Sequence, residues 1–387
     1  MTQNRIDIVH TGPETPCGKY LRQFWQPVYL SDDLEKGWAK RIQILGEYFT
    51  LYRGESGDAH VVEDRCPHRR TQLSTGEIEG DDIRCFYHGW KFAADGTCLE
   101  QPTEFDSFKR KVCIRSYPVR EYVGLIFAYF GEGEAPEFPE FPEAEYDNGY
   151  PLRTTVWELN YNYFQRLEND LDEAHVHFVH KISADETNEF SVLPIKYDAE
   201  ETDYGILRLT TRDRDGKLDT RHKHFMMPNS GLTFPPPATA LDDWSIHLSW
   251  RVPKNDEVTL SFVASRNKPR PDREKSGKEW QSSEEITQAI LEGRMRLKDV
   301  DPYHPRLFNI QDNVAIGGQG TIYDEREEER LGRSDVAVIM MRKLYEREIR
   351  AMMEGQPIKR WKRPREKLYL GFRAADGAKA TSGLKVM

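Results

Sequence analysis

CPHRRTQLSTGEIEGDDIRCFYHGW, residues 66–90, places a cysteine and a histidine two positions apart, and then a second such pair three positions apart. Cysteine is otherwise rare, because the whole chain of 387 residues contains five. Thiolate and imidazole together suit a zinc ion or an iron–sulfur cluster. We therefore expect two loops, one with Cys66 and His68 and the other with Cys85 and His88, to bind one metal centre.

The spacing of these residues favours one type of centre. In a Rieske [2Fe–2S] cluster, two thiolates bind one iron and two imidazoles bind the other. Zinc ribbons more often pair two C-x-x-C loops, and four residues with no metal would leave the spacing unexplained. Pro67 stiffens the first loop, and Gly89 permits close backbone approach after the second. The pattern predicts a Rieske cluster and leaves zinc as the alternative.

Composition indicates the class of protein around this site. The formal net charge of −10 argues against nucleic acid as a partner. No apolar run approaches the ~20 residues of a membrane span, and residues 1–16 lack the apolar core of a secretory signal. An odd number of irregularly spaced cysteines predicts a reducing, cytoplasmic location. Cys98 and Cys113 are expected to be small buried hydrophobic residues.

The pattern changes twice along the chain. Residues 1–35 are expected to form an N-terminal segment with a short helix at Tyr20–Trp25, and residues 36–135 a small all-β domain. Residues 132–151, rich in proline and acid, are expected to be a surface linker that marks the domain boundary. Residues 136–387 are expected to form the second domain.

Both domains show strand signals. RIQILGEYFTLYR, residues 41–53, predicts a hairpin with its turn at Gly46–Glu47, and VGLIFAYFG, residues 123–131, predicts a buried strand. In the second domain, strand-like runs alternate with two or three helices, which predicts an α+β domain with one antiparallel sheet. The last helix is expected from Ser334, as its N-cap, to Met353.

A second candidate site lies in LENDLDEAHVHFVH, residues 167–180. On a helix, Asn169, Asp172 and His175 share one face because they are three residues apart. His180 lies about 140° further round than His175 at 3.6 residues per turn. Both histidines can reach one metal only if the helix loosens there or ends near Val179.

Two imidazoles and one carboxylate form the facial triad of non-haem Fe(II) oxygenases, which leaves positions open for O2. We expect the carboxylate to be Asp312, whose neighbour Gln311 is neutral. Asp172 is better placed as the outer partner that orients His175. His177 points away from His175 by helical phase and is interpreted as a packing residue.

Local charge gives a hypothesis about the substrate. Arg221 and Lys223 lie on one face of a predicted strand, in a chain whose net charge is negative. Cationic side chains bind carboxylates well, so these two residues are candidate substrate ligands, with Arg208 and Arg212 as weaker candidates. A solvated strand face explains the same charges without a substrate and stays open as the alternative. As a substrate, the pattern favours an aromatic acid.

The two motifs in this order resemble the catalytic α subunit of a Rieske non-haem iron oxygenase, over nearly the whole chain. Trp90 directly after His88 and Gly89 resembles the oxygenase branch. GPETPCGKYLRQFWQPV (residues 12–28) and IQDNVAIGGQGTIYDEREEERLGRSD (residues 310–335) resemble the phthalate dioxygenase-like branch. The resemblance implies an α+β chain with a Rieske domain and a helix-grip catalytic domain. It also implies a homotrimer, and a separate NAD(P)H-dependent reductase that carries flavin and a [2Fe–2S] centre.

The family's site residues transfer onto matching positions of this sequence. The implied ligands are Cys66 and Cys85 for one cluster iron, His68 and His88 for the other, and His175, His180 and Asp312 for a mononuclear Fe(II). Asp172, with Asn169 beside it, is implied to connect the cluster of one subunit to the iron of the next.

The reaction class stays open at this point. The resemblance implies oxygenation of an aromatic substrate with O2, by cis-dihydroxylation or hydroxylation, or alternatively O- or N-demethylation by a monooxygenase. A Rieske electron carrier without catalysis, or a zinc-bound interaction module, would leave the second site unexplained.

Overall fold

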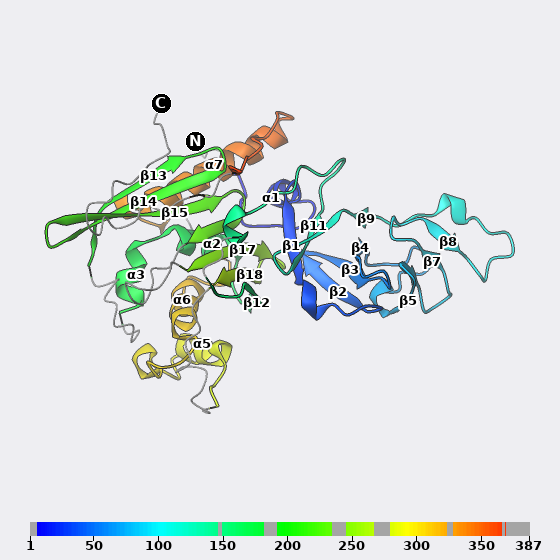
Figure 1. The fold of residues 1–387 in the computed structure, drawn as a ribbon, viewed down its shortest axis with the longest axis horizontal. Helices are drawn as coiled ribbons and strands as arrows, with labels where there is room; N and C mark the ends of the chain where they lie inside the picture. The colour runs from blue at the N-terminus through cyan, green and yellow to red at the C-terminus, as the bar shows by residue number, and fades with distance from the viewer. Residues whose placement is uncertain are drawn as a thin grey trace.

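The computed structural model describes residues 6–145, 149–181, 192–233, 245–266, 279–322, 328–365 and 368. Its larger half is built on a seven-stranded antiparallel sheet (Figure 1). The strands follow the spatial order β12 (Arg153–Leu159), β18 (Thr259–Arg266), β17 (Ile246–Pro253), β16 (Ser230–Thr233), β15 (Lys217–Met226), β14 (Gly205–Arg214) and β13 (Pro194–Glu201).

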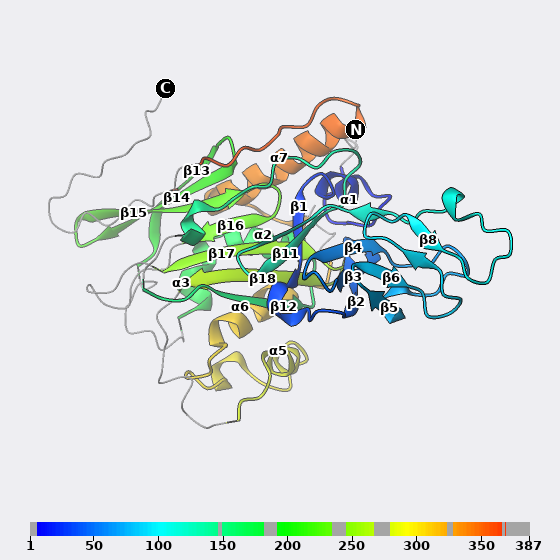
Figure 2. The same ribbon diagram turned by 45° about the vertical axis from the view of Figure 1, so that its right-hand side comes forward.

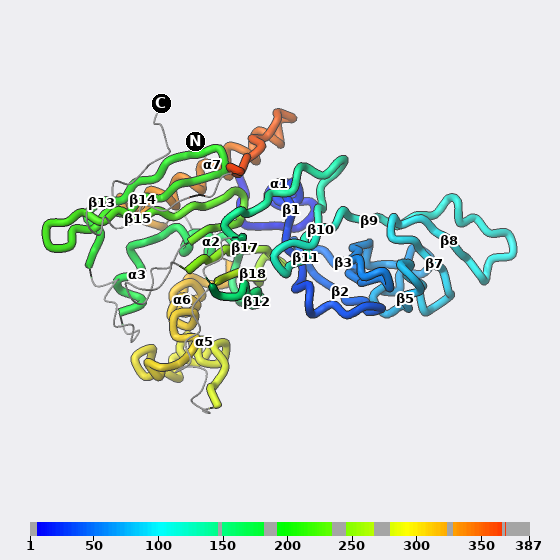
Figure 3. The backbone as a smooth tube through the Cα atoms, in the orientation of Figure 1, coloured from blue at the N-terminus to red at the C-terminus, as the bar shows by residue number. Residues whose placement is uncertain are grey.

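Helices accompany this sheet. They are α2 (Tyr163–Leu171), α3 (Ala174–Val179), α5 (Ser283–Leu291), α6 (Leu307–Gly317) and α7 (Val336–Met353). Helix α2 contacts β17, α6 and α7, and its Phe164 ring lies 5.0 Å from Tyr345 of α7. The N-terminal helix α1 (Pro16–Leu21) also contacts α7, so the two ends of the described chain lie side by side (Figure 3). The α+β class expected from the sequence is confirmed.

Three small antiparallel sheets make up the other half, at the right of Figure 1. The first contains β1 (Trp25–Leu30), β11 (Leu125–Tyr129) and β10 (Val119–Tyr122). The second contains β2 (Ala39–Ile44), β3 (Glu47–Arg53), β4 (Ala59–Glu63) and β9 (Ser116–Tyr117). The third contains β5 (Glu77–Glu79), β6 (Asp82–Arg84), β7 (Lys91–Phe92) and β8 (Cys98–Glu100).

The predicted hairpin forms between β2 and β3, but its turn lies one residue earlier than expected. Leu45 and Gly46 have φ of 52° and 76°, and Glu47 already belongs to β3. Two positive φ values match a type I′ turn, which suits the twist of a two-residue hairpin. The amides of Leu45 and Gly46 donate to Pro253 and Lys254 at 2.7 and 3.0 Å. These bonds tie the turn to the β17–β18 connection and stabilise the strained Leu45.

Two helix boundaries differ from the prediction. The first helix begins at Pro16 rather than Tyr20, because Thr15 accepts a bond from the Gly18 amide as N-cap and Pro16 suits the first turn. Trp25 instead starts β1. At the other end, α7 begins at Val336, and it is Asp335, not Ser334, whose side chain accepts a backbone bond, from Gly332.

The predicted buried strand is confirmed as β11, and the expected surface linker is partly wrong. In residues 132–145, Phe141 is buried and its ring lies 5.1 Å from Trp250 of β17. The indole of Trp25 donates to the carbonyl of Pro136 at 2.9 Å. The described part of this segment therefore packs between the two halves. Cys98 is buried as expected, whereas Cys113 is exposed, contrary to the prediction.

Asn162 fixes the start of α2 against two other segments. Its side-chain oxygen accepts the Phe164 amide, and its nitrogen donates to Val9 at 2.9 Å and to Asp256 at 2.7 Å. We expect Asn162→Ala to lower the free energy of unfolding by about 2–4 kcal/mol, because it removes a cap and leaves two buried carbonyls unpaired. Urea unfolding followed by circular dichroism measures this change.

Asn162→Ser is the matched control, since serine keeps an oxygen at the cap position and adds no charge, while the two amide donors are lost. An alanine variant as stable as the wild type would show that solvent or rearrangement replaces these bonds.

Candidate active site with two metal centres

The first cluster of candidate ligands lies on two loops at the end of the small sheets. Cys66 follows β4, and Cys85 begins the turn between β6 and β7. Each loop is closed by backbone bonds: Cys66 with Thr71 and Arg70, and Cys85 with Trp90 and Gly89. Gly89 has φ of 72°, and an added Cβ would lie 2.9 Å from Pro102 Cγ, so a side chain there would collide. The backbone thus brings both loops to one point.

The two cysteines of this cluster are buried, and its two histidines are partly buried and lie side by side. The His68 and His88 rings are 4.4 Å apart, and Trp90 stacks on His68 at 4.7 Å. His68 Nδ1 is buried and meets no hydrogen-bond partner in the described part of the chain. A hydrogen bond between the two thiols lowers the pKa of Cys85 to about 6 and raises that of Cys66. Two neighbouring buried thiols and an unpartnered imidazole nitrogen fit a [2Fe–2S] cluster.

The second cluster of ligands depends on a break in the helix that the sequence predicted as continuous. Helix α2 ends at Leu171, and Asp172 is extended with ψ of 131°. Asp172 Oδ1 accepts the Ala174 amide at 2.7 Å, which starts α3 in a new direction. The expected alignment of Asn169, Asp172 and His175 on one helix face is therefore wrong. Helix α3 does end at Val179, as predicted, and His180 follows it.

The break brings the candidate iron ligands together. One atom from each of His175, His180 and Asp312 lies within 4.8 Å of the others. Asp312 Oδ1, from α6, is 3.2 Å from His180 Nε2 and 3.6 Å from His175 Nε2. Two imidazoles and one carboxylate around a common point fit an Fe(II) facial triad.

Outer partners orient these ligands. Asp172 Oδ2 lies 3.3 Å from His175 Nδ1, and Asn169 Nδ2 lies 3.5 Å from His175 Nε2. His180 Nδ1 donates to Gln311 Oε1 at 2.9 Å. The sequence identified Gln311 only as a neutral neighbour of Asp312, whereas the structure gives it a contact of its own with a candidate ligand.

Arg166 and Asp170 are site residues that the sequence did not reveal. Arg166 donates to Asp312 Oδ2 at 3.2 Å and to Asn169 Oδ1 at 2.6 Å. Asp170 receives a two-pronged contact from Arg251 of β17, at 2.6 and 3.0 Å. The spacing of residues 166, 169 and 170 places them close together on α2 and is the sequence feature that could have identified them. Their partners Asp312 and Arg251, however, come from distant segments.

The two predicted substrate ligands lie on the same face of β15. Lys223 Nζ is 3.8 Å from Asp170, and Arg221 pairs with Asp219 at 3.7 Å. Arg208 of β14 lies opposite Lys223 in the sheet. Lys223 thus lies near the candidate iron site, because its partner Asp170 also contacts Arg166, which binds Asp312. Arg221 lies two residues away from Lys223 on the same strand.

Burial and charge shift two pKa values in this site. Burial alone would raise the pKa of Asp312, but the hydrogen bond with His180 and the charge of Arg166 lower it to about 2. Burial lowers the pKa of Lys223 to about 8, although Asp170 opposes this shift. Asp312 is therefore ionised at neutral pH, and Lys223 titrates near the physiological range.

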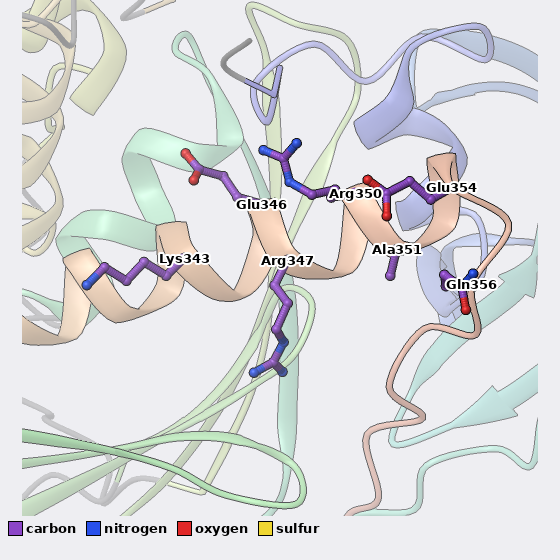
Figure 4. Close-up of a pocket in the computed structure, with 7 residues that line it drawn as sticks. All are labelled: Lys343, Glu346, Arg347, Arg350, Ala351, Glu354 and Gln356. Atoms are coloured by element: carbon purple, nitrogen blue, oxygen red, sulfur yellow. The ribbon is translucent and has the colours of Figure 1, made fainter. Parts of the chain in front are cut away.

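A surface groove runs along α7, away from both sites (Figure 4). Its lining contains Lys343, Glu346, Arg347, Arg350 and Glu354, and Arg347 is paired with Glu201 of β13 at 2.9 Å. Charged side chains predominate in this lining, and none of the candidate metal ligands belongs to it. Among the described residues, no helix combines the length and the apolar character that crossing a membrane requires.

Comparison with known proteins agrees with this geometry. A family model for the Rieske [2Fe-2S] domain matches residues 24–118. The oxygenase subunit of 5,5'-dehydrodivanillate O-demethylase from Sphingobium sp. is 32% identical over 90% of this chain and 80% of its own length. The α subunit of phenoxybenzoate dioxygenase from Ectopseudomonas oleovorans is 31% identical over 88% of this chain and 83% of its own length.

Solved structures share the fold. NdmA from Pseudomonas putida CBB5 superposes with a TM-score of 0.63 and 21% identity, over 87% of this chain and 92% of that one. The oxygenase of carbazole 1,9a-dioxygenase, in complex with a ferredoxin, superposes with a TM-score of 0.58 and 20% identity, over 87% of this chain and 93% of that one.

A Rieske domain joined to a helix-and-sheet domain with a two-histidine, one-carboxylate cluster defines a terminal oxygenase. The chain belongs to the Rieske non-haem iron aromatic ring-hydroxylating oxygenases, as a catalytic α subunit. It is accordingly an oxidoreductase whose cofactors are a Rieske [2Fe–2S] cluster and Fe(II).

Gln311 gives a test of the second site alone. We expect Gln311→Ala to weaken Fe(II) binding by about 10–100-fold, because His180 loses the acceptor that fixes its ring. Iron and acid-labile sulfide, measured on the same sample, separate the mononuclear iron from the cluster.

Gln311→Glu keeps an acceptor and should retain the iron. An alanine variant with full iron content would show that the contact of Gln311 with His180 does not matter for the metal.

Proposed function

We propose that Cys66 and Cys85 bind one iron of the cluster, His68 and His88 the other, and that His175, His180 and Asp312 bind the Fe(II). The donor types and the buried, convergent geometry of both sets support this assignment. When bound, the Fe(II) activates O2 with electrons that the cluster supplies. The protein's part is to orient both ligand sets and to position the substrate.

We also propose that electrons pass between subunits of a homotrimer, through Asp172. The β5–β8 sheet and α3 lie at opposite ends of the molecule in Figures 1 and 2, which disfavours transfer within one chain. Asp172 is about one quarter exposed and lies beside His175. Its partly exposed carboxylate can accept a bond from a cluster histidine of a neighbouring subunit.

The electrons are proposed to come from a separate NAD(P)H-dependent reductase with flavin and [2Fe–2S]. Relatives in this family work with separate electron carriers, and the carbazole dioxygenase oxygenase is in complex with a ferredoxin. Phe86 and Tyr87, in the loop with Cys85, are exposed. This loop is the surface that a carrier would approach.

The substrate is proposed to be an aromatic carboxylate, and one observation carries this proposal. A set of buried charges beside the iron site consists of two clusters. In one, Asp170 pairs with Arg166, Lys223 and Arg251, and Arg166 also pairs with Asp312; in the other, Glu173 pairs with Arg208 and Arg212. The five cations of this set exceed its three carboxylates. A surplus of buried positive charge is costly unless an anion neutralises it, so an anionic substrate matches the site.

Unpartnered donors in this set of charges indicate where the carboxylate would bind. Arg208 Nε and Arg212 Nη1 are buried and meet no partner among the described residues. Both arginines also bind Glu173, at 2.5 and 2.7 Å, which fixes their orientation. With Lys223 opposite Arg208, three cations face the side of the sheet next to α2.

The named substrates of relatives support this class. A dehydrodivanillate, a phenoxybenzoate, a chlorobenzoate and a phthalate occur in their names, and each is an aromatic carboxylate. Ring dihydroxylation is the primary reaction that we propose. O-demethylation is the second candidate, because a relative that spans 90% of this chain is an O-demethylase.

A product screen tests the function. The iron-loaded protein is mixed with a generic NADH-driven reductase and with benzoates, phthalates and methoxybenzoates, and products are identified by mass spectrometry. A gain of two oxygens and two hydrogens establishes dihydroxylation, and loss of CH2 with formaldehyde establishes demethylation. NADH oxidation without product from any of the acids would contradict the aromatic carboxylate.

Asp172→Asn tests the route of the electrons. We expect both metals to stay bound and turnover to fall by roughly a thousand-fold or more, because a neutral amide is a poorer bridge between the imidazoles than a charge-assisted carboxylate contact. Freeze-quench EPR of the reduced cluster measures its reoxidation by O2. Normal reoxidation in the variant would show that Asp172 is not the bridge.

Lys223 predicts a pH dependence for substrate binding. Its pKa is lowered to about 8 by burial, so the ammonium is present below that pH and is lost as the pH rises through it. We expect the dissociation constant of the aromatic acid to increase between pH 7 and pH 9. Lys223→Met should weaken binding about 10–100-fold at pH 7, the size of a charged hydrogen bond.

Lys223→Arg is the control, since its charge persists to high pH and its profile should be flat. A wild-type profile without any change across pH 8 would contradict the role of Lys223.

A further inference from the structure

The two oxygens of Asp312 have different surroundings. Oδ1 faces both histidines, at 3.2 Å from His180 and 3.6 Å from His175. Oδ2 instead accepts a bond from Arg166 Nη1 at 3.2 Å. A carboxylate can bind a metal through one oxygen or through both. In this site the second oxygen is already engaged by a cation.

Arg166 is itself fixed on three sides. It donates to Asn169 Oδ1 at 2.6 Å and lies 3.4 Å from Asp170 Oδ1, one turn further along α2. Asp170 is in turn bound by both prongs of Arg251 from β17. The Arg166 side chain is 14% exposed, so water does not compete strongly for its donors. The guanidinium is therefore rigid and does not swing away from Asp312.

We propose that Arg166 is a positioning residue that keeps Asp312 a one-oxygen ligand of the Fe(II). This proposal rests on the proposed iron site. Occupation of Oδ2 by Arg166 leaves one more coordination position open than a two-oxygen Asp312 would. The same contact directs the Asn169 oxygen toward Arg166 and its Nδ2 toward His175, 3.5 Å from Nε2.

The proposal has a consequence for metal affinity as well as for geometry. A cation beside a ligand competes with the metal for the carboxylate, and it repels a second positive charge. Removal of Arg166 therefore frees Oδ2 and removes the repulsion. Asp170 keeps Arg251 and Lys223 as partners after this removal, so the sheet remains attached to α2.

Arg166→Met tests the proposal. Crystal structures of the Fe(II)-loaded proteins report how many oxygens of Asp312 bind the iron, and near-infrared magnetic circular dichroism reports the coordination number in solution. We expect one oxygen in the wild type and two in the variant. We also expect Fe(II) affinity, measured by chelator competition, to tighten by roughly ten-fold, because a cation that competes with the metal for the carboxylate is removed.

Arg342→Met is the matched control. Arg342 of α7 is a similarly buried arginine that binds Glu168 of α2 at 2.7 Å, but it does not contact Asp312. Its loss should change neither the coordination nor the affinity. Arg166→Lys is the second variant, for use if Arg166→Met fails to fold. Because its shorter side chain holds Oδ2 less firmly than Arg166 does, we expect a mixture of molecules in which one or two oxygens of Asp312 bind the iron.

The outcomes separate this proposal from the proposed function. One-oxygen binding that persists in Arg166→Met, or loss of iron from a variant that keeps its cluster and its thermal stability, overturns the role of Arg166. Iron absent from His175, His180 and Asp312 in the wild type overturns the proposed iron site instead.

Discussion

The ion pair between Asp170 and Arg251 joins helix α2 to the seven-stranded sheet, and the iron site depends on that attachment. Both charges are buried, so separating them would expose each to an environment that cannot solvate it. Arg166 binds the same carboxylate and extends the contact to Asp312 on α6. A sheet strand, the helix before the break and the helix that carries Asp312 are thus connected by buried charges in addition to their packing contacts.

The break at Asp172 sets the direction of the helix that carries His175, because Asp172 leaves helical geometry and its carboxylate accepts the Ala174 amide at the start of α3. The end of α3 at Val179 then sets the position of His180. A helix that continued through His180 would place His175 and His180 on different faces, where they could not share a metal. Interrupting the helix costs little free energy, because the Asp172 side chain replaces one of the lost backbone hydrogen-bond partners. One residue therefore ends a helix, starts the next and orients His175.

Local signals in the sequence predicted the proposed ligands. The sequence did not reveal the contacts between distant segments. The loops of Cys66 and Cys85 were predictable because both ligands of each loop lie within four residues. Asp312 was expected from its place beside the neutral Gln311 and from the family resemblance, since nothing local connects it to His175. The role of Arg166 was not predictable, because its partner Asp312 lies 146 positions away, and the pair of Asp170 and Arg251 is likewise 81 positions apart. The helix break depends on a contact between Asp172 and the Ala174 amide, which helical spacing alone did not indicate. Propensity also misplaced α1, where Thr15 and Pro16 prevailed over the apolar pattern that followed.

The turn at Leu45 and Gly46 has a consequence for how the two halves of the molecule behave together. Its two amides donate to the carbonyls of Pro253 and Lys254, so the hairpin of one half completes the hydrogen bonding of a tight connection in the other. Excising the Rieske half would expose two donors and two acceptors that bind each other in the intact chain. In chimeras that exchange Rieske halves between relatives, the β17–β18 connection should therefore be taken from the same parent as the hairpin, because the two segments bind each other.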